Sequence, residues 1–165
     1  MTKCNVLHLN YIPKLWDDKV EAICSSWNGT PYKLNGCKKG WEADCIHFGA
    51  AVLDELYGVS HSRNLQSLPA DACVHNKKGV MKAVRALLNA YPSHRQVMDG
   101  TLESGDLVIL GPASKEPTAA HLRIAGKQGR LWQCTNVGVH VTGCVISDRE
   151  MLVSIYRASD KVLWC

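Results

Sequence analysis

The segment from Asp44 to Gly58 decides more than any other how this chain can fold. Its positions are almost all apolar, which predicts a helix with little polar surface and therefore a buried one. Asp44 is a residue type that caps helix N-termini, and Gly58 is the type that most often ends helices. We therefore expect a buried helix that begins directly after Asp44 and ends at Gly58.

Two further helices and a series of strands are predicted around this segment. Apolar residues recur at helical spacing over 16–27, where Asp17 and Asp18 are placed in the first turn, and again over 80–91. The second half favours strands over 106–110, 121–125, 131–135, 137–145 and 152–157. Helices followed by a meander of strands predict an α+β fold, with N-terminal helices packed on a C-terminal antiparallel sheet.

Length and composition indicate one domain over residues 1–165, because 46% of the residues are hydrophobic and 21% are charged. A chain of this length buries roughly two thirds of its unfolded surface, so its eight cysteines are not required as disulfides. The net charge of +4 comes from scattered Lys and Arg, which argues against nucleic acid as a partner. The irregular stretch 60–78 is interpreted either as a lid or specificity loop or as a surface insertion.

Targeting and cofactor motifs are not found in the sequence. Asn5, His8 and Asn10 interrupt the apolar residues of 1–13, which excludes the apolar run of a signal peptide, and nothing approaches the ~20 apolar residues of a membrane span. We expect synthesis in the cytoplasm. The glycine patterns of dinucleotide and phosphate sites and the spacing of zinc ligands are absent as well, so the expected chemistry needs no cofactor and no metal.

Cys45 is the candidate nucleophile. It follows the cap Asp44, and a sulfur at a helix N-terminus is stabilised as thiolate by the helix dipole and the unpaired N–H groups. His121 opens a predicted strand and shares one face of it with Arg123. A cysteine and a histidine that are distant in sequence but adjacent in space are what thiol catalysis requires. His121 is therefore the candidate base.

A third polar residue is needed to hold the imidazole of His121 in one tautomer. Gln133 lies on the next predicted strand after a single hairpin, so its side chain is expected beside His121. His140 lies on a later strand and is the alternative for the same role. The sequence favours Gln133 and leaves His140 open.

Four motifs in this order carry a family resemblance. They are Gly29-Thr30-Pro31-Tyr32, Asp44-Cys45, Gly105-Asp106-Leu107-Val108 and His121-Leu122-Arg123-Ile124. They resemble the G-x-P-Y, D-C-S-G, G-D-L-V and H-V-G-I segments of the NlpC-type papain-like cysteine peptidases. The resemblance runs from about Val20 to Cys134 and looks closest to the phage-tail and gene-transfer-agent branch of that family.

The resemblance implies a papain-like fold and a role for each matching residue. The implied catalytic residues are Cys45 as nucleophile, His121 as base and acid, Gln133 as the residue that orients His121, and Tyr32 near the oxyanion position. Asp44, His47 and Arg123 are the candidate substrate contacts, and the cation of Arg123 is suited to recognise a carboxylate. The chain departs from the family pattern where Ile46-His47 replace Ser-Gly, Gln133 replaces the commoner His, and Arg123 replaces Gly.

The function expected from these residues is hydrolysis of an amide bond by a cysteine peptidase. The resemblance implies a peptidoglycan stem peptide as substrate, cut between D-glutamate and a diamino acid in the cell wall. A same-fold acyltransferase, amidase or isopeptidase is one alternative, and a non-catalytic binding module or tail-tip component is another. An enzyme of this branch reaches the wall on a virion tail or at lysis, so a virion-associated location is also expected.

Overall fold

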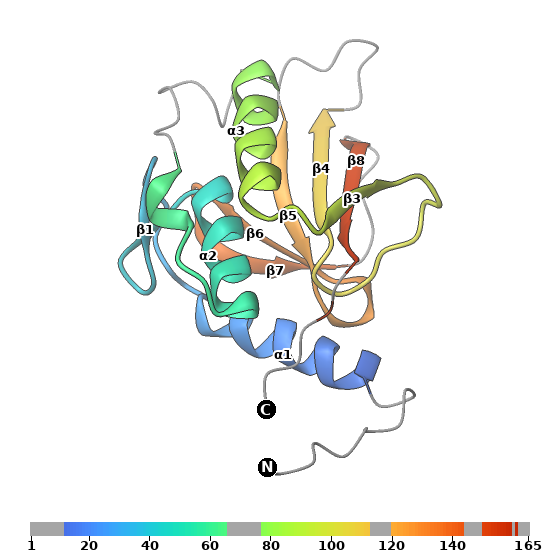
Figure 1. Cartoon of the computed structure of the whole chain (residues 1–165). Helices are drawn as coiled ribbons and strands as arrows, with labels where there is room; N and C mark the ends of the chain where they lie inside the picture. The colour runs from blue at the N-terminus through green and yellow to red at the C-terminus, as the bar shows by residue number, and fades with distance from the viewer. Residues whose placement is uncertain (1–11, 66–76, 113–119, 144–149, 160, 162–165) are drawn as a thin grey trace.

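The computed structural model describes residues 12–65, 77–112, 120–143, 150–159 and 161 (Figure 1). The described chain combines α-helices with an antiparallel sheet, which confirms the predicted α+β class. The helices are α1 (Ile12–Ser26), α2 (Cys45–Tyr57) and α3 (Lys77–Ala90), with short 3-10 turns η1 (Ser62–Asn64) and η2 (Lys127–Gly129). None of these helices is long and apolar enough to cross a bilayer.

One sheet forms the body of the fold. Its strands, in spatial order, are β3 (His94–Val97), β8 (Glu150–Ala158), β4 (Leu107–Pro112), β5 (His121–Ala125), β6 (Leu131–Thr135) and β7 (Gly138–Thr142), and every neighbouring pair is antiparallel. In Figure 1, β6 and β7 run crosswise to β4 and β8, so the sheet is strongly twisted. A separate small hairpin pairs β1 (Cys37–Lys38) with β2 (Glu42–Ala43).

The predicted meander is only partly right. Strands β4 to β7 do follow one another across the sheet, but β8 returns to the other side of β4 and separates it from β3, a strand that the sequence did not indicate. The helix predicted at 16–27 starts at Ile12, so Asp17 and Asp18 fall beyond its first turn. Residues 144–145 of one predicted strand and most of the predicted lid, residues 66–76, lie outside the described part of the chain.

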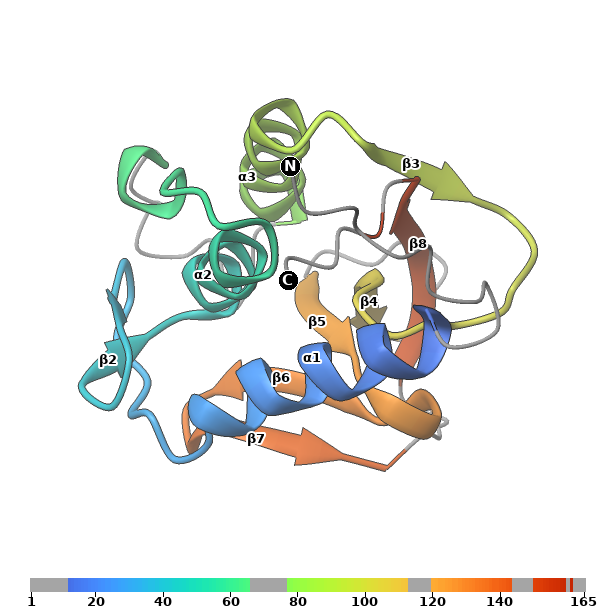
Figure 2. The same ribbon diagram turned by 60° about the horizontal axis from the view of Figure 1, so that its bottom comes forward.

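Helix α2 is the centre of the main core. It begins at Cys45 after its cap Asp44 and ends at Gly58 in the left-handed conformation, as predicted. Gly49 allows it to lie close to β5, since a Cβ there would be 2.6 Å from Leu122 Cδ2. Helices α2 and α3 cover the same face of the sheet in Figure 1, while α1 crosses its lower end and comes forward in Figure 2.

The two faces of the sheet differ in character. Leu122, Ile124 and Trp132 face the main core together with α2, whereas Val108 and Leu131 belong to a smaller apolar cluster. Because successive residues of a strand point to opposite faces, that smaller cluster lies on the face turned away from α2. The odd-numbered residues of β5 share this second face.

Gly138 joins β7 to the loop before α2 and gives a test of the fold. Its φ is +91°, and a Cβ would lie 2.6 Å from the carbonyl oxygen of Thr30. Gly138→Ala should therefore lower the free energy of unfolding by roughly 2 kcal/mol or more, from left-handed strain and steric overlap. Gly143→Ala is the matched control, because nothing lies within 4 Å of its Cβ position and its φ is ordinary. Urea unfolding of both variants measures the difference, and equal stabilities would contradict this packing.

Candidate active site

The N-terminus of α2 is fixed by the buried carboxylate of Asp44, which is 0% exposed. Its Oδ1 accepts the backbone N–H of His47 at 2.8 Å, and its Oδ2 accepts His47 Nδ1–H at 2.8 Å and the backbone N–H of Asn35 at 2.6 Å. Asp44 was expected to contact substrate, but in this structure its carboxylate is enclosed and satisfied by these donors. Asp44 therefore acts on Cys45 indirectly, by holding the start of the helix.

The predicted oxyanion residue Tyr32 lies on a segment that runs beside this helix start. The backbone N–H of Ala43 donates to Pro31 O at 2.9 Å, and the N–H of Lys33 donates to Ala43 O at 2.8 Å, so Tyr32 and Ala43 form a parallel bridge. Ala43 precedes the cap of α2. The structure therefore brings the backbone of Tyr32 next to the residues that lead into Cys45, and the Tyr32 side chain is half-buried against the core.

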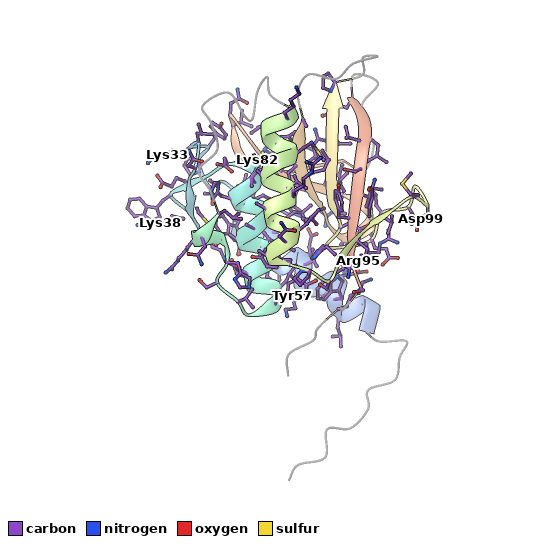
Figure 3. The ribbon with its side chains drawn as sticks, turned by 45° about the horizontal axis from the view of Figure 1, so that its top comes forward. Lys33, Lys38, Tyr57, Lys82, Arg95 and Asp99 are labelled. Carbon is purple, nitrogen blue, oxygen red and sulfur yellow. The ribbon has the colours of Figure 1, made fainter. Side chains whose placement is uncertain are left out.

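The loop between Tyr32 and Asp44 is basic and exposed. Lys33 and Lys38 project outward from it (Figure 3). Trp41 is 71% exposed, and Lys38 Nζ lies 4.5 Å from the centre of its indole ring. This loop provides an aromatic and cationic rim a few residues from Cys45.

Strands β5, β6 and β7 gather a polar cluster on the second face of the sheet. Gln133 is paired in register with Arg123 on β5 and with His140 on β7, which places it diagonally from His121. Gln133 Nε2 lies 2.9 Å from His140 Nε2, and His140 Nδ1 lies 2.9 Å from Gly138 O. Gln133 is thus in register with Arg123 and lies beside His121 only along the diagonal.

His121 is held in its neutral form. Burial lowers the pKa of its imidazole to about 4, the positive charge of Arg123 acts in the same direction, and the Gln133 side chain, acting as an acceptor toward the ring, partly opposes them. The Nε2 atom of His121 is buried and has no hydrogen-bond partner in the structure. A neutral imidazole near pH 7 can accept a proton, which is the state a general base needs.

Arg123 is 8% exposed and forms an ion pair with Glu150 of β8. The sequence indicated that Arg123 recognises a substrate carboxylate, and in this structure Glu150 occupies its guanidinium. A substrate carboxylate would have to compete with Glu150. Nothing in the sequence pointed to Glu150, because the pairing joins residues of strands that lie on either side of β4.

Cys45 is 1% exposed and belongs to the main core. Helix α2 packs on the face of β5 that carries Leu122, whereas His121 is turned to the other face by strand alternation. His121 is the first residue of β5, so its ring can approach Cys45 only around the end of the strand. Contact between Cys45 Sγ and His121 stays a prediction.

His47 is the other histidine near Cys45. It lies two positions further along α2, and side chains at this spacing do not face each other on a helix. Its Nδ1–H is also used by Asp44. His47 is therefore unsuited to be the base for Cys45. The described residues bring no three His, Cys, Asp or Glu side chains together in a way that would hold a metal ion.

Comparison with known proteins adds no assignment to this geometry. No model of a known protein family matches the chain, and no curated protein matches it. The assignment of function therefore depends on the residues and their arrangement.

Two histidines with buried ring nitrogens, His121 and His94, predict acid sensitivity. In the unfolded chain His121 becomes protonated below about pH 6.5, whereas in the folded chain it stays neutral until about pH 4. The free energy of unfolding therefore falls as the pH falls across this window. At ~1.4 kcal/mol per pKa unit, His121 accounts for a loss of roughly 3 kcal/mol. Buried His94, whose pKa is also lowered by burial, adds to the loss.

Urea unfolding between pH 7.5 and 4 measures the slope of the free energy of unfolding against pH in the wild type, in His121→Asn and in His61→Asn. The exposed His61 is the matched control, and its replacement should leave the slope unchanged. The His121→Asn variant should show a clearly smaller slope. An equal slope in all three proteins would contradict the burial of a neutral His121.

Proposed function

We propose that this chain is a papain-like thiol hydrolase of the NlpC type, in which Cys45 attacks an amide carbonyl and His121 serves as base and acid. The observation that carries the proposal is the position of Cys45, which opens the buried helix α2 packed against β5, the strand that begins with His121. Gln133, on the neighbouring strand, orients His121.

The proposed reaction has two stages. The neutral imidazole of His121 takes the thiol proton as the sulfur of Cys45 bonds to the carbonyl carbon. The oxyanion that forms accepts hydrogen bonds from the backbone N–H of Cys45, at the helix start, and from the Tyr32 hydroxyl. The C–N bond then breaks, His121 returns the proton to the leaving amine, and water hydrolyses the thioester with His121 again as base.

The proposed substrate is a peptidoglycan stem peptide, cut between D-glutamate and a diamino acid. Arg123 supports a substrate that carries a carboxylate, because its cation lies on the face of β5 that also carries His121. His47, buried two positions after the nucleophile on α2, is bulkier than the small residue of the family pattern, which also suits another acyl group. A virion tail is the proposed carrier of such an enzyme to the cell wall.

One observation favours a second candidate, a non-catalytic binding or tail-tip module with the same fold. Cys45 is 1% exposed, and α2 packs on the face of β5 opposite to His121. A thiol enclosed in this way is protected from reagents as well as from substrate. The reactivity of Cys45 therefore separates the two candidates.

Replacement of Cys45 tests the hydrolase directly. Cys45→Ala and Cys45→Ser should abolish release of muropeptides from purified peptidoglycan, by several orders of magnitude in rate, because the nucleophile is lost. Cys37→Ala is the matched control, since Cys37 is another cysteine outside any disulfide, it lies near α2, and it is not the proposed nucleophile. Mass analysis of the released fragments identifies the bond that is cut. Full activity of Cys45→Ala would exclude the proposed mechanism.

Alkylation by iodoacetamide tests the proposal without any substrate. If the protein is the proposed hydrolase, Cys45 of the native protein should be alkylated near pH 7, and His121→Asn should slow this reaction. Burial raises the pKa of Cys37, so that cysteine should react only at more alkaline pH. Peptide mass mapping reads both sites in one sample. Protection of Cys45 at all pH values where the chain stays folded would favour the non-catalytic module.

A further inference from the structure

We propose that His140 is a positioning residue that fixes the amide of Gln133 and, through it, the tautomer of His121, so that Nδ1 of His121 is left as the base. The proposal rests on the proposed function only in its use of His121 as base. The sequence treated Gln133 and His140 as alternatives, whereas the structure joins them by a hydrogen bond.

The tautomer of His140 follows from its neighbour Gly138. Nδ1 of His140 lies 2.9 Å from Gly138 O, and a carbonyl oxygen can only accept. Nδ1 therefore carries the proton, and Nε2 of the neutral ring is an acceptor. Gly138 is itself held in place, because the N–H of Val139 donates to Thr30 O at 2.8 Å.

The orientation of the Gln133 amide follows from His140. Nε2 of Gln133 lies 2.9 Å from the acceptor Nε2 of His140, so the NH₂ group faces β7. The oxygen Oε1 must then face the other way. Gln133 is 6% exposed, and within the structure Oε1 is buried without a hydrogen-bond partner.

His121 provides the partner that this oxygen lacks. Its Nε2 is also buried without a hydrogen-bond partner among the described residues, and it lies on the adjacent strand diagonal to Gln133. The Gln133 side chain raises the pKa of the ring, as an acceptor oxygen turned toward it does. An acceptor oxygen and a ring nitrogen that are both cut off from water are satisfied together when Nε2–H donates to Oε1. A neutral imidazole has one ring proton, so Nδ1 of His121 is then unprotonated.

Arg123 cannot replace this partner. It shares the face of His121, but a guanidinium only donates, and its charge opposes a second proton on the ring. Glu150 forms an ion pair with the guanidinium. Gln133 is thus the acceptor that the described part of the chain offers to Nε2 of His121.

An amide differs from a second histidine or a carboxylate at this position because its two ends are opposite in hydrogen-bond character. If the Gln133 amide turned over, its NH₂ group would face His121, Nε2 would become the acceptor, and Nδ1 would carry the proton. His121 would then be unable to take a proton from Cys45 through Nδ1. His140 opposes this reversal because its acceptor nitrogen matches only the NH₂ end.

The test is the tautomer of His121 in the full chain labelled with ¹⁵N-histidine, read from long-range ¹H–¹⁵N spectra at pH 7. The variants are His140→Gln, which keeps an acceptor oxygen toward Gln133, and His140→Leu, which removes it. Val141→Ala is the matched control, because Val141 is the next residue of β7 and is exposed on the other face. His121→Asn assigns the signal, and circular dichroism confirms folding.

The wild type, His140→Gln and Val141→Ala should show His121 protonated on Nε2, and His140→Leu should show a mixture of both tautomers. In parallel, His140→Leu should lower kcat for muropeptide release roughly 10- to 100-fold, with KM little changed. A wild-type His121 protonated on Nδ1, or a tautomer that does not respond to His140→Leu, would overturn the inference. If the expected tautomers are seen but no hydrolysis is detected, the role of His140 in fixing Gln133 and His121 is kept and the proposed function is rejected.

Discussion

The carboxylate of Asp44 is the interaction on which the arrangement of the site depends. It lies fully buried at the start of α2 and accepts one backbone and one side-chain hydrogen from His47 and one backbone hydrogen from Asn35. A buried carboxylate needs such donors, because burial without them is costly. The same bonds fix the first turn of α2 and the end of the preceding loop, so Cys45 has a defined position relative to Tyr32.

The two faces of the sheet carry different residues: apolar core residues on one face and the polar cluster on the other. On β5 the residues of one face, Leu122 and Ile124, form the core under α2, and those of the other face, His121 and Arg123, meet Gln133 from β6. The period of two along each strand produces this separation. In the proposed hydrolase, a contact between His121 and Cys45 would therefore form at the end of β5, where His121 is the first residue of the strand.

The sequence predicts the local elements well because their signals are local. The cap Asp44, the terminator Gly58 and the apolar run between them define α2 within a residue, and alternation defines the strands that carry His121 and Gln133. The order of the strands in the sheet is not predicted by local signals. The return of β8 beside β4 is set by contacts between distant segments, and no turn signal between neighbouring strands encodes it.

In the candidate site, too, the sequence predicts local features but not the contacts between distant segments. Residue types and spacing selected His121, Gln133 and Arg123, and the structure does gather them on one face. In the β5–β6 hairpin Gln133 is in register with Arg123 and diagonal to His121, around a turn over 126–130 that contains η2 and the positive φ of Gln128. Glu150 was missed since only the completed sheet brings β8 near Arg123. Spacing therefore predicts which side chains share a face and not which atoms pair.

The charges around His121 determine which kind of thiol chemistry the site can support. Burial and the cation of Arg123 both lower the pKa of His121, and the Gln133 amide offers a hydrogen bond but no negative charge to offset them. In the proposed hydrolase an imidazolium beside a thiolate is therefore disfavoured in the free protein, and the proton of Cys45 would move during the attack itself. Under these conditions the N-terminal dipole of α2 is the main stabiliser of negative charge on sulfur. For the proposed hydrolase, the position of Cys45 at the first residue of a capped helix therefore matters as much as the histidine proposed as its base.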